Sequence, residues 1–148
     1  MAGASAGIQI DIDDAELQAG LKKLAARIGD LTPFFRDIGE ELLNSTRARF
    51  GTQTSPAGVP WEALSPAYQK RKRKNRDKIL TLDGHLRGTL NYRVAPDELR
   101  IGIGTPLIYG ATHQFGRPEQ NIPPRPFLGL SDADREAILD ALRDWLAG

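Results

Sequence analysis

The chain contains no cysteine, so disulfide bonds and thiolate chemistry are excluded. It also has no apolar run near the roughly 20 residues that a membrane-spanning helix needs. The N-terminal stretch MAGASAGIQIDIDD has neither a basic start nor an apolar core, so we do not expect a secretory signal. These absences are consistent with synthesis inside a cell, where thiols and disulfides play little structural part.

The size and composition are those of one ordinary globular domain, which we take to span residues 1–148. Apolar residues make up 40% of the chain and charged residues 26%. Glycine and proline are abundant, with 15 and 10 copies, which predicts several turns and non-repetitive arms.

The charge is unevenly distributed, although the net charge is only +1. Residues 70–78, KRKRKNRDK, hold seven basic side chains and one acid, and the remaining 13 basic and 18 acidic residues give −5. The sequence is therefore an acidic domain with one basic segment. Its basic residues are Lys70, Arg71, Lys72, Arg73, Lys74, Arg76 and Lys78.

The first half of the chain predicts a short strand and two helices. Alternation of Ile8, Ile10 and Ile12 with polar residues indicates a strand with one buried face. Asp13 or Asp14 can then cap a helix. The Thr32 hydroxyl can cap a second one, with Pro33 at its first position. Apolar residues recur at helical spacing in both, which predicts an antiparallel helix pair: Leu17, Leu21, Leu24 and Ile28, then Phe34, Ile38, Leu42 and Phe50.

The second half predicts loops, a hairpin and a last helix. After a loop over residues 51–60, Trp61 is expected to anchor the chain, and Ser65-Pro66 to start a short helix that runs into the basic segment. A short helical turn is expected over residues 83–87. Residues 89–95 and 99–104 alternate around a Pro-Asp-Glu turn and predict a β-hairpin. Ser131 caps a helix expected over residues 132–146.

This order of elements is typical of an α+β fold. The strands are too few for a doubly wound sheet. We expect a small antiparallel sheet packed with the N-terminal helix pair and the C-terminal helix. Such a sheet keeps open edges, where a neighbouring subunit can bind.

The residues that could carry catalysis are sparse and have structural explanations. His85 and His113 lie in different segments, and neither has a second ligand at metal spacing. No G-x-S-x-G motif or phosphate-binding glycine loop is present. We therefore expect no catalytic residue, no metal and no cofactor, and interpret His113 as a residue that orients a turn.

The basic segment 70–78 allows three interpretations. It can be a solvated surface, a contact for an acidic protein, or a contact for the phosphates of DNA, which would be independent of sequence and sensitive to salt. Aromatic residues for base stacking are missing apart from Tyr68, so sequence-specific binding is not expected.

Residues 116–127 predict an extended arm. Three of the four residues in Pro123-Pro124-Arg125-Pro126 are proline, which holds a chain extended and reduces the entropy lost on docking. Two interpretations remain open, a rigid crossover within the chain and an arm that contacts another subunit. Phe127 is expected to pin the arm to the body.

The ordered set WEALSP, a Lys/Arg-rich stretch, ILTLDGHLRGTL, YGATHQFG, PPRPFLGLS and a closing amphipathic helix resembles the phage virion morphogenesis family. That family includes tail completion protein S of temperate myophages and protein G of phage Mu. One departure is Asp83, where relatives often have threonine before the glycine.

The resemblance implies a structural virion protein at the head–tail junction, made in the bacterial host cytoplasm. It further implies tail completion, tail termination or a neck role, performed as a cyclic homo-oligomer, expected to be hexameric, without catalytic residues. Partners would be further copies and neighbouring neck or tail tube proteins, with non-specific DNA contact as an alternative. The candidate interface residues are His113, Gln114, Phe115, Arg117, Pro124, Arg125, Pro126 and Phe127.

Overall fold

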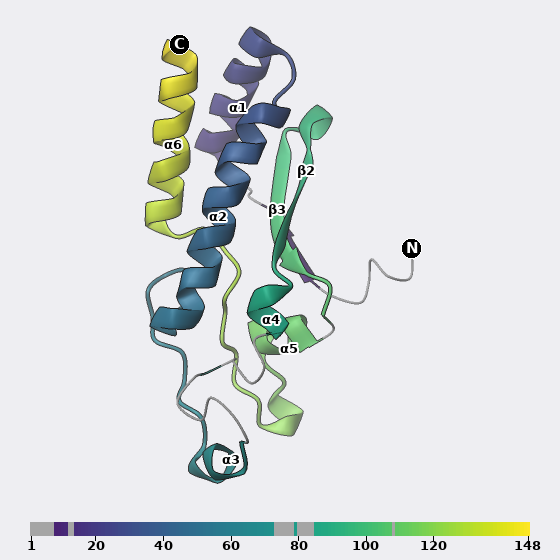
Figure 1. The fold of residues 1–148 in the computed structure, drawn as a ribbon, viewed down its shortest axis with the longest axis vertical. Coiled ribbons are helices and arrows are strands. Elements are labelled where there is room, and N and C mark those ends of the chain that lie inside the picture. The colour runs from purple at the N-terminus through teal and green to yellow at the C-terminus, as the bar shows by residue number, and fades with distance from the viewer. Residues whose placement is uncertain (1–7, 12–13, 73–78, 80–84, 108) are drawn as a thin grey trace.

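The computed structural model describes residues 8–11, 14–72, 79, 85–107 and 109–148. The chain is elongated, with long helices and a sheet at one end and loops with short helices at the other (Figure 1). The element order is β1 (Ile8–Asp11), α1 (Ala15–Ile28), α2 (Thr32–Thr52), α3 (Pro66–Arg71), α4 (His85–Gly88), β2 (Asn91–Ala95), η2 (Pro96–Glu98), β3 (Arg100–Thr105), α5 (Tyr109–Phe115), η3 (Pro118–Gln120) and α6 (Asp132–Ala147). The predicted α+β class is confirmed.

The sheet has three antiparallel strands in the order β1-β3-β2. The predicted hairpin is confirmed as β2 and β3, with Tyr92 opposite Ile103 and Val94 opposite Ile101. Because β3 is the central strand, all its residues from Ile101 to Thr105 are buried. β1 and β2 form the two edges of the sheet.

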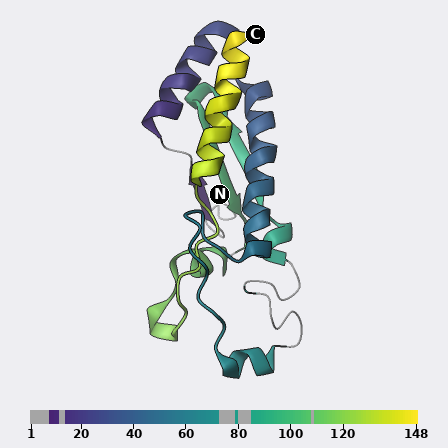
Figure 2. The ribbon, with the colours of Figure 1, turned by 90° about the vertical axis from the view of Figure 1, so that its left-hand side faces the viewer.

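The helices form layers on one side of the sheet. Helix α2 packs against β2 and β3, and α6 packs on α1 and α2 on the side away from the sheet (Figures 1 and 2). The core takes leucines 17, 21 and 24 from α1, the inner face of α2, and Ile138, Leu139 and Leu142 from α6. Apart from Ile28, which is exposed, the predicted apolar stripes therefore meet in one core, whose burial supplies most of the stability of such a domain.

Gly39 allows the close approach of α2 to the sheet. A Cβ atom at this position would lie 2.6 Å from two ring carbons of Tyr92. The Tyr92 ring fills that space, and desolvation, followed by a hydrogen bond with Glu40, raises the pKa of its phenol. A glycine inside a helix costs about 1 kcal/mol relative to alanine, chiefly in backbone entropy. The packing of the Tyr92 ring on Gly39 offsets this cost.

Capping groups define the helix ends. Asp14 accepts hydrogen bonds from the amides of Glu16 and Leu17, which confirms one of the two predicted caps of α1. The prediction that Thr32 caps α2 was wrong: Leu31 is the cap residue, and Asp30 Oδ1 accepts from the Thr32 amide and hydroxyl. Helix α2 also includes Gly51 and Thr52, which we predicted in the loop.

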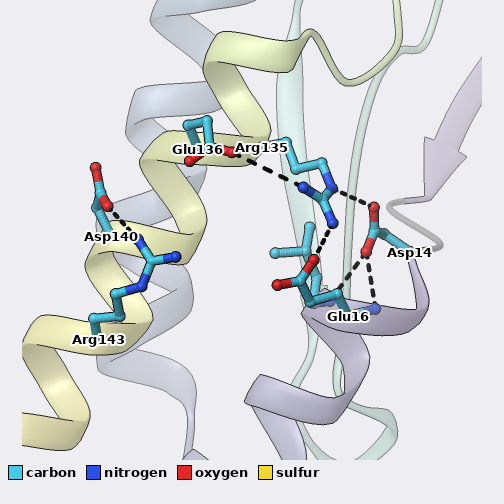
Figure 3. A network of polar contacts seen from close by, with 7 residues as sticks. Asp14, Glu16, Arg135, Glu136, Asp140 and Arg143 are labelled. Carbon is cyan, nitrogen blue, oxygen red and sulfur yellow. Dashed lines mark hydrogen bonds and ion pairs between the residues drawn. The ribbon is translucent and has the colours of Figure 1, made fainter.

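A partly exposed charge network joins the starts of α1 and α6 (Figure 3). Arg135 Nε donates to Asp14 Oδ2 at 2.7 Å, and Arg135 Nη2 donates to Glu16. Hydrogen bonding from Arg135, followed by that from the Leu17 amide, lowers the pKa of Asp14. These bonds tie the start of α6 to the start of α1, on which it packs.

Candidate functional site

The candidate interface residues lie at the loop-rich end, beside the lower part of α2. Residues 125–128 cross the interior there without belonging to a helix or strand. A buried segment of this kind needs a partner for each main-chain polar group, because unpaired groups are costly away from water. The side chains of three residues elsewhere in the chain, Gln114, Arg49 and Trp61, supply most of those partners.

Gln114 is the central partner, and it comes from α5, a helix that we did not predict. Its Oε1 accepts hydrogen bonds from the amides of Phe127 and Leu128, both at 3.0 Å. Its Nε2 donates to the Leu128 carbonyl, also at 3.0 Å. One buried amide thus replaces the three bonds that a neighbouring strand would have made.

Arg49 and Trp61 bind the next two carbonyls. Arg49 Nη1 donates to the Phe127 carbonyl at 2.8 Å, and Trp61 Nε1 donates to the Pro126 carbonyl at 2.7 Å. Arg49 Nη2 also donates to Asp134 Oδ2 at 2.7 Å, which joins the end of α2 to the start of α6. Burial lowers the pKa of Arg49, but a guanidinium stays charged at physiological pH.

Arg125 is bound inside its own chain. Its side chain is 7% exposed. Nε donates to the Glu62 carbonyl at 2.7 Å and Nη2 to the Ala63 carbonyl at 3.1 Å, while its main-chain amide donates to the His113 carbonyl. Arg125 therefore holds residues 62–63 against the arm, and a role for it between subunits stays a prediction.

Phe127 pins the arm to the body, as predicted, with 0% of its side chain exposed. Its ring packs on Phe50, whose ring also meets Trp61, with centroids 5.8 and 5.6 Å apart. The predicted anchoring role of Trp61 is confirmed by its burial in this cluster. Offset and edge contacts of this kind stabilise a fold beyond the area they bury.

His113 lies beside this network in a partly buried place. Its Nδ1 is buried and has no hydrogen-bond partner among the described residues. Burial, followed by the charge of Arg125, lowers the pKa of the imidazole, so the ring is neutral near pH 7. Its ring meets Tyr109 edge-on at 5.8 Å. The role of His113 in orienting a turn stays a prediction.

The predicted extended arm over residues 116–127 was wrong in its first half. Residues 117–122 form a closed loop, in which Arg117 and Ile122 exchange main-chain hydrogen bonds of 2.7 and 3.1 Å around helix η3. Asn121 takes a left-handed conformation, and Gly116, at φ 75°, leaves room for the Pro124 and Ile122 main chain. We call residues 115–124 the projecting loop.

The projecting loop carries the exposed members of the candidate set. Phe115, Arg117 and Pro124 are exposed, whereas Gln114, Arg125 and Phe127 are buried and Pro126 is half-buried. Arg117 also makes one long bond to Thr112, at 3.4 Å. The structure therefore divides the eight residues into a fixed base and an outward loop.

The basic segment lies partly outside the described residues. Lys70 and Arg71 are exposed on α3, at the end of the molecule away from α6 (Figure 1). Lys72 is buried. Arg73, Lys74, Arg76 and Lys78 lie outside the residues that the structure describes.

The described part of the chain offers little that metal chemistry could use. No group of three His, Cys, Asp or Glu side chains in that part could hold a metal ion. Over the same part, no helix has the length and apolar character needed to cross a membrane. What the site does provide is a well-fixed base beside an exposed loop.

Comparison with known proteins gives the family. The model of the phage virion morphogenesis family matches residues 12–147, and the chain belongs to this family. "Putative capsid assembly protein G" of Escherichia phage Mu is 31% identical over 150 residues, 94% of each chain. "Mu-like prophage FluMu G protein 2" of Haemophilus influenzae is 28% identical over 145 residues, 93% of this chain and 95% of the relative.

A shorter likeness extends to a protein of Methanocaldococcus jannaschii, 33% identical over 74 residues, 47% of this chain and 55% of that one. No solved structure matches the chain. Family membership gives the chain a role in phage virion structure or assembly, and indicates a structural rather than a catalytic protein.

Sequence reasoning missed Arg49 and the base-forming role of Gln114. A signal for Arg49 was present, because residues 42, 46, 49 and 50 share the buried face of α2. A charged residue on an apolar stripe needs a buried partner. The partner itself, Asp134, is 85 positions further along the chain, and no local pattern connects the two.

Proposed function

We propose that this protein is a connector at the phage head–tail junction, a tail-completion, tail-terminator or neck component that works as a homo-oligomeric ring. The observation that carries the proposal is the fixed base at residues 125–128. Its bonds to Gln114, Trp61 and Arg49 hold the projecting loop in one conformation. A loop that is already ordered loses little entropy when it docks, so its contacts can contribute to assembly.

The ring would be cyclic, hexameric in the virion, and would bind neighbouring neck or tail tube proteins. In a cyclic ring every interface joins one surface of a subunit to a different surface of the next. The protein would be made in the cytoplasm of the bacterial host and reside in the virion. No step of this role needs a cofactor.

Imaging of assembled particles tests the location. Cryo-electron microscopy of purified virions should show a closed ring of this chain between head and tail. Particles that lack the chain should accumulate as separate heads and tails. Finding the chain only in the head shell, or only in unfinished heads, would overturn the head–tail assignment.

A second candidate is non-specific DNA contact by the segment 70–78. The observation that favours it is the exposure of Lys70 and Arg71 at one end of the elongated molecule. Titration of random duplex DNA at two salt concentrations should give affinity that falls steeply with salt. An absence of binding at low salt would leave these side chains as protein contacts or as a solvated surface.

A further inference from the structure

Large apolar side chains left exposed by the single chain gather at the loop-rich end. Among the described residues these are Val59 between α2 and α3, Tyr68 on α3, Tyr109 and Phe115 on α5, and, on the helical body, Ile28 at the end of α1. Phe115 and Val59 are the most open, at 65% and 61% exposed. Exposed apolar side chains that gather in one region indicate a surface that another molecule covers.

These side chains belong to two separate parts of the chain. Tyr109 and Phe115 are on α5, and Phe115 begins the projecting loop. Val59 and Tyr68 are on residues 53–71, which descend from α2 to α3 and which we call the descending segment. Figures 1 and 2 show α3 and the projecting loop as different bodies at the same end of the molecule.

The two parts also differ in charge. Glu119 is exposed on the projecting loop and has no ion pair among the described residues. On the descending segment Lys70 and Arg71 are exposed, and the Arg71 guanidinium carbon is 5.7 Å from the centre of the Tyr68 ring. Each part thus presents an aromatic side chain and exposed charges. The projecting loop carries Arg117 as well as Glu119, and Glu119 is the one whose charge is opposite to that of Lys70 and Arg71.

Opposite charges next to apolar anchors set the register of a protein contact. A ring contact needs two different surfaces on each subunit, and this chain carries two that complement each other. We propose that the projecting loop of one copy docks on the descending segment of the next, with Phe115 against Val59 and Tyr68, and Glu119 beside Lys70 and Arg71. The inference rests on the proposed ring and adds which surfaces form its interface.

Site-specific cross-linking tests this contact, because a chain without cysteine gives every introduced thiol a unique position. Glu119→Cys and Arg71→Cys are purified separately, mixed under conditions in which the wild-type chain oligomerises, and treated with a short bis-maleimide. We expect a covalent dimer from the mixture and none from either variant alone. Glu136→Cys, exposed on α6, is the matched control and should link to neither.

Three further variants measure the strength of the contact. Phe115→Asp should weaken assembly about tenfold or more, because a buried aromatic anchor is replaced by a charge. Glu119→Arg should weaken it up to about fivefold, and Glu119→Arg combined with Arg71→Glu should recover most of that loss. Circular dichroism checks that each monomer remains folded.

The outcomes separate the interface from the ring. A wild-type oligomer with no cross-link in the mixture would reject this contact and leave the ring standing. Dimers formed by a single variant with itself would mean that like surfaces meet, which also rejects it. For a chain that assembles only on the virion, particles built from the Glu119→Cys/Arg71→Cys chain should give a ladder of covalent oligomers. A junction without this chain would reject the ring itself.

Discussion

In the helix–sheet body, apolar stripes of α1, α2 and α6 face one another, and main-chain hydrogen bonds stay within helices and strands. In the loop-rich end, residues 126–128 belong to no helix or strand that could supply such bonds. Their main chain is bound by the side chains of Gln114, Arg49 and Trp61. The two regions have similar burial at their centres but different chemistry.

This difference predicts different tolerance to substitution. Apolar contacts in the body are non-directional, so a swap that conserves volume costs less than about 1.5 kcal/mol. In the loop-rich end the hydrogen bonds of Gln114, Arg49 and Trp61 are directional, and a buried group left without its partner costs about 1–3 kcal/mol. The loop-rich end should therefore be more sensitive to polar changes than to apolar ones.

The largest expected effect is that of Arg49→Ala. The substitution leaves the Asp134 carboxylate buried without its cation and the Phe127 carbonyl without its donor. We expect the free energy of unfolding to fall by about 3–5 kcal/mol, measured by urea denaturation. Arg143→Ala removes an exposed pair with Asp140 and should change it by less than about 0.5 kcal/mol.

A loss below about 1 kcal/mol for Arg49→Ala would contradict this view of the loop-rich end. It would mean that water or a rearranged side chain satisfies Asp134 as well as Arg49 does. The comparison with Arg143 remains useful in that case, because both pairs have nitrogen and oxygen 2.7 Å apart and differ chiefly in burial.

The next effect is that of Gln114→Leu, which keeps the size of the side chain and removes three hydrogen bonds. We expect a loss of about 2–4 kcal/mol, since two amides and one carbonyl become unsatisfied. Hydrogen exchange should show early loss of protection at Phe127 and Leu128, before the amides of α1. Gln114→Glu keeps the acceptor and should retain part of the protection.

If Gln114→Leu reduces hydrogen-exchange protection equally in α1 and at Phe127, the distinction between the two regions is wrong. Equal loss would show that the base and the helical body open as one cooperative unit. Selective loss at residues 127–128 would show that the base is a separate unit on which the projecting loop depends.

Elements with local determinants were predictable from the sequence. Ser131 and Asp14 cap α6 and α1 as expected, and the alternation around Pro96 to Glu98 gave the hairpin. Helix α5 was not predicted because it has only seven residues, and the buried ones are Gly110 and Gln114. Without an apolar stripe, helical periodicity has nothing to detect.

The candidate site was predictable in outline only. Its sequence location was evident from the prolines and aromatics between residues 113 and 127. Which side chains form the base and which face outward depends on contacts across 13 to 85 positions, such as Gln114 with Phe127 and Arg49 with Asp134. Such pairs are set by tertiary packing, for which a single sequence carries no direct signal.

A moderate effect is expected in the body, at Gly39. Gly39→Ala places a methyl group 2.6 Å from the Tyr92 ring, so α2 must shift from the sheet. Overpacking of this kind should cost about 1–3 kcal/mol in urea denaturation. Gly51→Ala is the matched change in the same helix, with nothing within 4 Å, and should stabilise by about 0.5–1 kcal/mol.

Opposite signs for these two glycines would show that packing dominates backbone propensity at the helix–sheet contact. A stabilising Gly39→Ala would instead mean that Tyr92 turns away easily. The body would then be more adaptable than the close approach of ring and helix implies.

The smallest effect concerns pH, at the partly exposed network that joins α1 and α6 (Figure 3). The Arg135 hydrogen bond is the main cause that holds the pKa of Asp14 below its ordinary value. A carboxyl whose pKa is lowered in the folded state stabilises the fold at pH values above its unfolded pKa of about 3.9. That contribution is lost as the pH falls through the folded-state pKa. Arg135→Gln should therefore lower the urea midpoint slightly at pH 7, and the difference from wild type should shrink as Asp14 is protonated. If the difference in urea midpoint persists unchanged once Asp14 and Glu16 are both protonated, Arg135 acts through the packing of its side-chain stem and not through its charge.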